Sequence, residues 1–412
     1  MEIFEIVTLL TVVAALFGYI NVRFLKLPST IGLLAMALVF TLLIVFIGQF
    51  SPHVLDRAEK AIALIDFKTV LLDVMLSFLL FAGALHTKLD QLRLMKGPII
   101  AFSTLGVLIS TALVAVLMYY LLIAFDYPVS FQYCLLFGAL ISPTDPIAVL
   151  GILKQVGAPK KLEVKIVGES LFNDGIGVVV FLSLFGLAAG SGHIGAEEIA
   201  LLLLEEVGGG IVLGLLMGYF GFRLMRSIDH YETEVMLSLA LVMGGYLLAS
   251  YLHFSGPLAV VVAGLFIGNR AREAAWSEET ENYLDKFWEL IDVFLNAILF
   301  VLIGLELLVL DIKPHYLWIG IAAIPLTLVA RYLALIGPIR IFQKRLEFVP
   351  GTARIMTWGG LRGGISIALA LSLAPEMKRE MFLVITYVVV IFSILVQGLS
   401  VGKLIKHFTA KE

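Results

Sequence analysis

Apolar runs long enough to cross a bilayer follow one another along almost the whole chain. A transmembrane helix needs roughly 20 mostly apolar residues, and about thirteen such runs can be marked. They lie at about 4–21, 30–49, 67–86, 97–123, 131–153, 163–189, 197–222, 233–252, 255–269, 284–309, 315–339, 353–374 and 380–402. Hydrophobic residues make up 60% of the chain, against roughly 45–50% in soluble domains. The sequence therefore predicts an all-α polytopic membrane protein with about 13 transmembrane helices.

The basic residues alternate from one connection to the next. Of the 29 Lys and Arg residues, 21 fall in connections after odd-numbered runs or in the C-terminal tail, and 5 fall after even-numbered runs. Cytoplasmic loops carry an excess of Lys and Arg. We therefore expect a multi-pass protein of the plasma membrane with its N-terminus outside and its C-terminus in the cytoplasm.

Several classes of protein are disfavoured. The net charge of −3 comes without a contiguous basic patch, so no nucleic-acid partner is expected. A phosphate-binding Gly-Lys loop is missing, so nucleotide-driven pumping is disfavoured as well. The single Cys134 cannot form an intramolecular disulfide, and we interpret it as a packing residue. Glu2 and Glu5 stand where a signal peptide would be basic, so the first run is interpreted as a membrane span.

Two of the runs are interrupted by helix-breaking residues. The sequence SPTDP occupies 142–146 in the fifth run, and WGGLRGGIS occupies 358–366 in the twelfth. The two lie seven runs apart, which makes them antiparallel, and paired broken helices in inverted halves are typical of a transporter's midplane site. We predict one transmembrane transporter domain over 1–412 in which the two breaks cross at the midplane. Its parts are a first repeat at about 1–190, a linking helix at about 197–226 and an inverted second repeat at about 232–409.

A carboxylate in the sixth run is the main candidate for function. Charged side chains at membrane depth must face protein or water, and Asp174 lies roughly 14–17 Å deep by helical rise. Ser170 lies one turn away on the same face. Asp174 is therefore expected to bind a dehydrated cation or a proton, with Ser170 and the backbone freed around Thr144 as further oxygen ligands.

Glu169 lies on the neighbouring face, and we expect it to pair with Arg362, the cation placed nearest the membrane centre. A purely structural salt-bridge network is the plainer alternative. It explains these two residues but leaves Asp174, Asp145 and both helix breaks without a reason.

Four segments resemble the signature segments of the monovalent cation:proton antiporter-1 family, the NhaP-like sodium/proton antiporters. They are SPTDP at 142–146, GESLFNDG at 168–175, GLRG at 360–363 and VQGLS at 396–400. The resemblance implies a secondary active antiporter that exchanges Na⁺, and we expect Li⁺ as well, for H⁺ by alternating access. It also implies a homodimer in which a core moves against a dimerisation domain. The residue roles it implies are Asp174 as shared cation and proton carrier with Asn173 beside it, Thr144 and Ser170 as further Na⁺ ligands, Asp145 at the crossing of the unwound helices, and Glu169 paired with Arg362.

The chain departs from this family in two places. Members often carry an acid near the end of the third run, and residues 81–86 hold none. The chain stops about ten residues after the last run, so we expect no soluble C-terminal regulatory domain.

Other functions remain as alternatives. A K⁺/H⁺ antiporter is the nearest, because oxygen ligands on a flexible break do not fix the ionic radius, and a cation channel would have a similar acidic path. A membrane-embedded enzyme is disfavoured because Ser170 has no adjacent His to activate it. We expect no enzymatic activity and no cofactor. Since Asn173 cannot titrate, exchange is predicted to be one-for-one and electroneutral.

Overall fold

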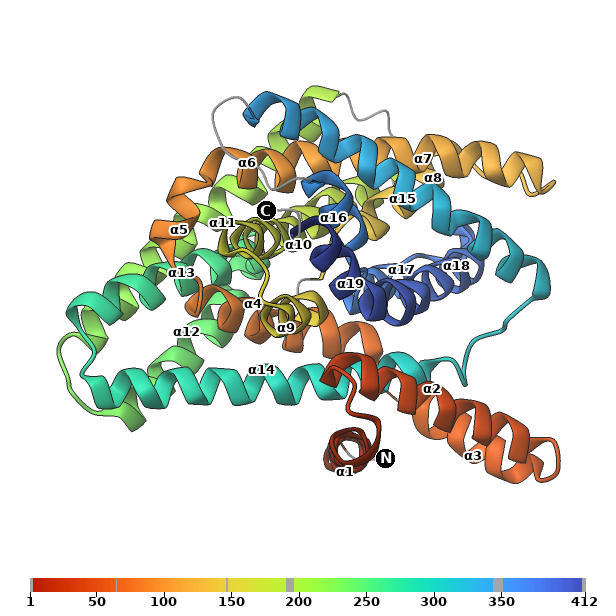
Figure 1. The fold of residues 1–412 in the computed structure, drawn as a ribbon, viewed down its shortest axis with the longest axis horizontal. Helices are drawn as coiled ribbons and strands as arrows, with labels where there is room; N and C mark the ends of the chain where they lie inside the picture. The colour runs from red at the N-terminus through yellow and green to blue at the C-terminus, as the bar shows by residue number, and fades with distance from the viewer. Residues whose placement is uncertain (1–2, 64, 146, 190–195, 344–350, 410–412) are drawn as a thin grey trace.

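The computed structural model describes residues 3–409 except 64, 146, 190–195 and 344–350, and these residues form helices and connections without a strand (Figure 1). The helices of the first half are α1 (Ile3–Ile20), η1 (Asn21–Leu25), α2 (Ser29–Gly48), α3 (Pro52–Ala63), η2 (Thr69–Met75), α4 (Leu76–Leu85), α5 (Leu89–Leu94), α6 (Lys96–Ala101), η3 (Phe102–Gly106), α7 (Val107–Ala124), α8 (Phe131–Ile141), α9 (Ile147–Val156) and α10 (Lys160–Ala189). Those of the second half are α11 (Ala196–Met225), α12 (Tyr231–Tyr251), α13 (Gly256–Ala274), α14 (Glu278–Glu306), α15 (Pro314–Phe342), α16 (Thr352–Trp358), α17 (Gly364–Leu371), η4 (Pro375–Met377), α18 (Arg379–Phe392), η5 (Ser393–Gln397) and α19 (Gly398–Thr409).

The helical architecture predicted from the apolar runs is confirmed. In the described part of the chain, nine continuous helices are long and apolar enough to cross a membrane. The other four predicted runs correspond to helices that are short or interrupted or, for α13, that end in charged residues. These are η2 with α4, α8 with α9, α13, and α16 with α17.

The two predicted helix breaks are present. The backbone leaves the helix at 142–145 between α8 and α9, and again at 359–363 between α16 and α17. Pro143 supplies the first interruption because proline removes a backbone donor and clashes with the preceding turn. Four glycines weaken the helix at the second one. Each of the two interrupted runs therefore consists of two half-helices, α8 with α9 and α16 with α17.

Helices α11 and α13 are packed through a row of glycines. A methyl group on Gly210 would lie 2.8 Å from the Ser255 carbonyl oxygen, and one on Gly218 would lie 2.8 Å from Cβ of Phe266. Small residues one turn apart allow membrane helices to approach closely where no hydrophobic force drives them together. The row therefore fixes α11 against α13.

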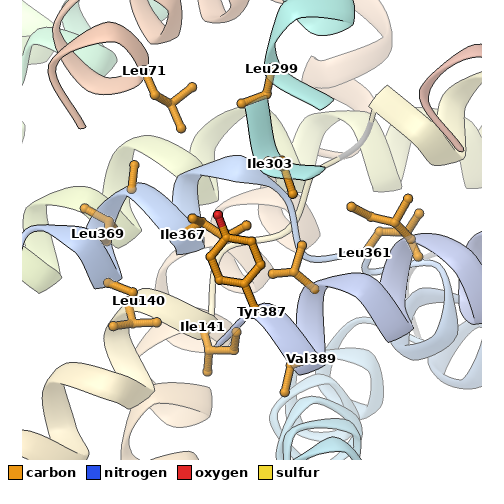
Figure 2. Packing of buried hydrophobic residues seen from close by; sticks show 14 of the residues in the cluster. Leu71, Leu140, Ile141, Leu299, Ile303, Leu361, Ile367, Leu369, Tyr387 and Val389 are labelled. Carbon is orange, nitrogen blue, oxygen red and sulfur yellow. The ribbon is translucent and has the colours of Figure 1, made fainter. Parts of the chain in front are cut away.

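The core surrounds the half-helices. Figure 2 shows Leu140 and Ile141 of α8, Ile367 and Leu369 of α17, and Tyr387 of α18 close together, with side chains of α14 above them. All five are buried. The interior-facing parts of both breaks are thus held in a continuous apolar cluster that also contains α14 and α18.

A short amphipathic helix, α3, was not predicted from the sequence. It follows α2 and carries an exposed ion pair in which Lys60 Nζ lies 2.8 Å from Asp56 Oδ2. The search for apolar runs passes over such a helix because its mean hydropathy is close to zero.

Candidate functional site

The two helix breaks cross each other. The Asp145 amide donates a 2.8 Å hydrogen bond to the Leu361 carbonyl oxygen, which joins the first break to the second. At Gly363 an added Cβ would lie 2.5 Å from Asp145 Oδ2, so the second helix break can pass this close only with glycine there. Backbone outside a helix is tolerated at membrane depth where protein or a water-filled cavity satisfies its polar groups. The predicted crossing is therefore observed.

Arg362 binds the end of the first half-helix. Its Nη1 donates to the carbonyl oxygens of Ser142 at 2.5 Å and Pro143 at 2.9 Å, and its own amide donates to Ser393 Oγ at 2.9 Å. The last carbonyls of a helix carry partial negative charge, which a cation stabilises. Arg362 thus supplies hydrogen-bond donors to carbonyl oxygens that the proline break leaves without helical partners. Its positive charge also stabilises the C-terminus of α8.

Asp145 occupies the complementary position. It lies two residues before the start of α9 and close to Gly363, the N-cap residue of α17. A carboxylate is stabilised near helix N-termini, where amide groups point outward. The crossing therefore places an acid beside two helix N-termini and an arginine at a helix C-terminus.

Asn173 and Ser170 attach α10 to the first break. Asn173 Nδ2 donates to Thr144 Oγ1 at 2.8 Å, and Asn173 Oδ1 accepts from the Thr144 amide at 3.2 Å. Thr144 Oγ1 lies 3.2 Å from Ser170 Oγ. All three side chains are buried. Asn173 thus holds Thr144 of the first break through two hydrogen bonds, and it is also the neighbour of Asp174.

Asp174 lines a cavity of about 1130 Å³. The carboxylate is buried, with 6% of the residue exposed, and it lines the cavity together with Asp145, Pro143 and Gly363 of the two breaks. Ser170 lies one helical turn before it on α10. The structure thus brings Thr144, Ser170 and Asn173 into direct contact and places Asp174 and Asp145 on a common cavity. Coordination of Na⁺ by Asp174, Ser170 and Thr144 stays a prediction.

The predicted partner of Glu169 is wrong. Glu169 Oε1 lies 2.6 Å from Arg331 Nη2 of α15, and both side chains are almost completely buried. Arg362 binds carbonyl oxygens instead. Gly360 permits this arrangement, because Arg331 Nε would lie 3.1 Å from an added Cβ there.

Helix length explains the error. At 29 residues, α15 spans roughly 43 Å, well beyond the roughly 30 Å hydrocarbon core. Arg331 lies about 16 Å from the end of the helix at Phe342, and its side chain reaches Gly360, two residues from Arg362. Depth counted from one end of each run did not reveal this second central arginine.

The last predicted run supports the second break. A π-helical segment, η5, sits between α18 and α19 and contains Ser393 and Gln397. Gln397 Nε2 donates to the Trp358 carbonyl oxygen at 3.0 Å, and Trp358 Nε1 donates to Ser400 Oγ at 2.8 Å. Single π-turns often occur at functional sites. The VQGLS segment thus receives a structural role that the sequence did not supply.

Sequence reasoning missed one wall of the cavity. Four polar residues of α14 line it, namely Asp285, Glu289, Asp292 and Asn296. Their spacing of four, three and four residues places them on one helical face. That spacing is visible in the sequence and was the signal that could have identified them.

The polar side chains around the crossing offer oxygen atoms as ligands. Among the residues that the structure describes, no group of three or more His, Cys, Asp or Glu side chains could hold a metal ion. Hydroxyl, amide and carboxylate oxygens are nevertheless concentrated around Thr144 and Asp174.

Comparisons with known proteins agree with this geometry. The family model described as sodium/hydrogen exchanger, transmembrane, matches residues 11–407. The chain is 50% identical to the Na⁺/H⁺ antiporter NhaP of Pseudomonas aeruginosa, with 98% of this chain and 97% of that protein covered. It is 34% identical to the Na⁺/H⁺ antiporter NhaH of Halobacillus dabanensis, with 93% of each covered.

A solved structure has the same fold. The sodium proton antiporter MjNhaP1 of Methanocaldococcus jannaschii, determined at pH 8, superposes with a TM-score of 0.78 at 20% identity over 99% of both chains. With the family model matching nearly the whole sequence, the chain belongs to the transmembrane sodium/hydrogen exchanger family.

Proposed function

We propose that this protein is a secondary active antiporter that exchanges Na⁺ for H⁺ across the plasma membrane. One observation carries the proposal. Asp174 is buried in α10 and lines a large cavity at the crossing of two broken helices. A carboxylate in such a place can be neutralised either by a proton or by a dehydrated cation. The names of the relatives, Na⁺/H⁺ antiporters over nearly the whole chain, support the choice of ions.

Exchange then follows from a single shared site. Asp174 binds Na⁺ with oxygen atoms from Ser170 and Thr144, or it binds a proton, and it crosses between the two faces in either loaded form. Asp145 and Arg362 stabilise the half-helices around it, and the Glu169–Arg331 pair holds α10 to α15. No cofactor enters this cycle. Li⁺ is expected to replace Na⁺, and K⁺ is the alternative substrate.

The cavity is proposed to face the cytoplasm. Lys88 and Lys160 lie among its lining residues, and the distribution of Lys and Arg assigns their connections to the cytoplasmic side. The described structure would then be inward-facing, with the N-terminus outside. We further propose a homodimer, with the inverted repeats at about 1–190 and 232–409 contributing one broken helix each to the crossing.

The test is exchange in everted membrane vesicles from cells without other antiporters. A respiratory proton gradient quenches a pH-sensitive dye, and Na⁺, Li⁺ or K⁺ is then added separately. We expect dequenching by Na⁺ and Li⁺ that disappears in Asp174→Asn, a variant that keeps the side-chain shape. Dequenching that K⁺ alone produces would favour the alternative substrate, and full activity of Asp174→Asn would refute the proposal.

A further inference from the structure

The polar face of α14 forms a stripe that runs toward the crossing. Asp285, Glu289, Asp292 and Asn296 all line the cavity, and successive members lie one turn apart. Leu299, less than one turn beyond Asn296, lies next to the second break, because an added Cβ on Gly364 would meet Leu299 Cδ1 at 2.6 Å. By helical rise Asn296 is about 4.5 Å and Asp292 about 10 Å from that level along the axis. The stripe thus leads from the wider cavity to the neighbourhood of Asp174.

Asp285, the first acid of the stripe, is already engaged. Its Oδ1 lies 2.7 Å from Arg272 Nη2 and 3.5 Å from His86 Nδ1, and its Oδ2 accepts from Arg272 Nη1 at 2.9 Å. Glu281 binds the same guanidinium group. This carboxylate is therefore compensated by Arg272. It is a poor candidate for holding a transported cation.

Asn296 has a fixed orientation and a carbonyl oxygen without a donor. Its Nδ2 donates to the Asp292 carbonyl oxygen at 2.8 Å and to Asp292 Oδ1 at 3.0 Å. Exchanging the amide N and O would place three acceptors against one another, so the hydrogen bonds assign the orientation. Asn296 is 4% exposed, and within the described residues its Oδ1 has no hydrogen-bond partner.

An unsatisfied buried acceptor costs about 1–3 kcal/mol. A ligand in the cavity would remove this cost at Asn296, because Oδ1 belongs to a residue that lines the cavity. Asp292, one turn away and bound to the same amide, adds a carboxylate on the same wall. Both ligand atoms are oxygens, the ligand type that hard cations prefer. The choice of a monovalent ion follows from the proposed exchange of Na⁺ for H⁺.

We propose that Asp292 and Asn296 form a second binding site for a monovalent cation, in the cavity wall on α14 and separate from Asp174. The cation binds there with part of its hydration shell, through the Asp292 carboxylate and the Asn296 carbonyl oxygen. It occupies this site on its way between the cavity mouth and the crossing. The inference rests on the proposed function for its role in transport, but cation binding itself does not depend on exchange.

A structural hydrogen bond within one helix is the competing explanation. An Asp–Asn pair one turn apart stabilises a helix by a few tenths of a kcal/mol, and it would account for the Nδ2 contacts. It leaves Oδ1, a buried acceptor on a residue that lines the cavity, without a partner among the described residues. The two explanations differ in whether Na⁺ binding depends on Asp292 and Asn296.

The first experiment measures binding without transport. Purified Asp174→Asn protein, which lacks the carboxylate that is proposed to carry Na⁺, is titrated with ²²Na⁺ in a scintillation proximity assay. We expect saturable binding of one Na⁺ per chain that Li⁺ displaces. Adding Asp292→Asn or Asn296→Leu should weaken it about tenfold or more, the factor that corresponds to about 1.4 kcal/mol. Glu279→Gln, which removes one exposed acid from the first turn of the same helix, is the matched control and should leave binding unchanged.

The second experiment asks whether the site is on the transport path. With Asp174 intact, Asp292→Asn and Asn296→Leu should raise the Na⁺ concentration for half-maximal exchange about tenfold when Na⁺ is added on the cavity side, without changing the maximal rate. Sodium added on the opposite side should give the wild-type value. Curves that superpose on the Glu279→Gln control, in both assays, would overturn the second site. Wild-type protein that binds ²²Na⁺ but exchanges nothing would refute the proposed function and leave the second site standing.

Discussion

Glu169 of α10 and Arg331 of α15 form an ion pair with 2.6 Å between Oε1 and Nη2, buried beside the crossing of the broken helices. The side chain of the same arginine also lies close to Gly360, so it connects α10 and α15 with the second break. Two charges at this depth are costly unless they meet each other. We therefore interpret the pair as the contact that holds α10 to α15.

Removing one partner should expose that cost. Arg331→Met leaves Glu169 as an uncompensated buried charge, and we expect a loss of about 3–5 kcal/mol in the free energy of unfolding. Arg340→Met, on the same helix but exposed, should have little effect. Thermal unfolding in detergent measures both. The double variant Glu169→Gln with Arg331→Met should lose less than the sum of the singles, because neither charge is then left alone. Strictly additive losses would show that the two groups do not interact.

The broken helices show how far the sequence alone leads. Proline and glycine inside apolar runs predicted both interruptions, and their antiparallel placement predicted the crossing that the bond from Asp145 to Leu361 now joins. Thr144 and Ser170 were predicted as neighbours, and the structure brings their hydroxyl groups within 3.2 Å. Such features follow from local chemistry, because a break inside a membrane helix needs partners at the same depth.

Features that depend on tilt and on the choice among neighbours were not predictable. Arg331 reaches Gly360, two residues from Arg362, and the path of α15 decides which of the two arginines meets Glu169. Nothing in the apolar run at about 284–309 singles out Asp292. The structure instead places it on the cavity wall. Which face of α14 borders water is set by its packing against other helices, and no pattern in one helix contains that information.

Close approach at the crossing gives a second prediction. Gly363→Ala adds a methyl group that would lie 2.5 Å from Asp145 Oδ2 and 2.7 Å from its Cβ, so the two breaks must separate. We expect this variant to lose most of its Na⁺-driven exchange in everted vesicles. The residue has φ −118° and ψ −161°, so crowding rather than backbone strain is the cause.

Gly337→Ala is the matched control for this change. It adds the same methyl group to α15 at a position with nothing within 4 Å. Replacing an exposed helical glycine by alanine should be neutral or stabilising by up to about 1 kcal/mol. Equal activity of the two variants would show that the approach of Asp145 to Gly363 is dispensable.

Competition between Na⁺ and H⁺ gives a third prediction. If Asp174 alternates between the two ions, each proton bound excludes one Na⁺. Raising the pH removes the competing proton, so the Na⁺ concentration for half-maximal exchange should fall as the pH rises, while the maximal rate changes less. Initial rates in proteoliposomes with equal pH on both sides measure this. A half-maximal concentration that stays constant with pH would indicate separate sites for the two ions.

The last prediction concerns charge movement, and it depends on Asn173. A carrier that exchanges two protons for one Na⁺ needs a second titrating group that moves with Asp174. Its neighbour Asn173 is an amide with both polar atoms bound to Thr144. Glu169 is already paired with Arg331, so we expect it to take no part in the ion exchange. One Na⁺ or one H⁺ then leaves the site equally neutral, so exchange should be electroneutral.

An electrogenic cycle would gain or lose about 2.3 kcal/mol per charge for every 100 mV, whereas this one should not respond to the membrane potential. The measurement is Na⁺-driven proton flux in proteoliposomes whose potential is set by K⁺ and valinomycin. Rates and end-points should coincide at zero and at strongly negative potential. A systematic shift with potential would mean that a second group titrates, and Asp145 is the first to replace by Asn, because its carboxylate lines the same cavity as Asp174.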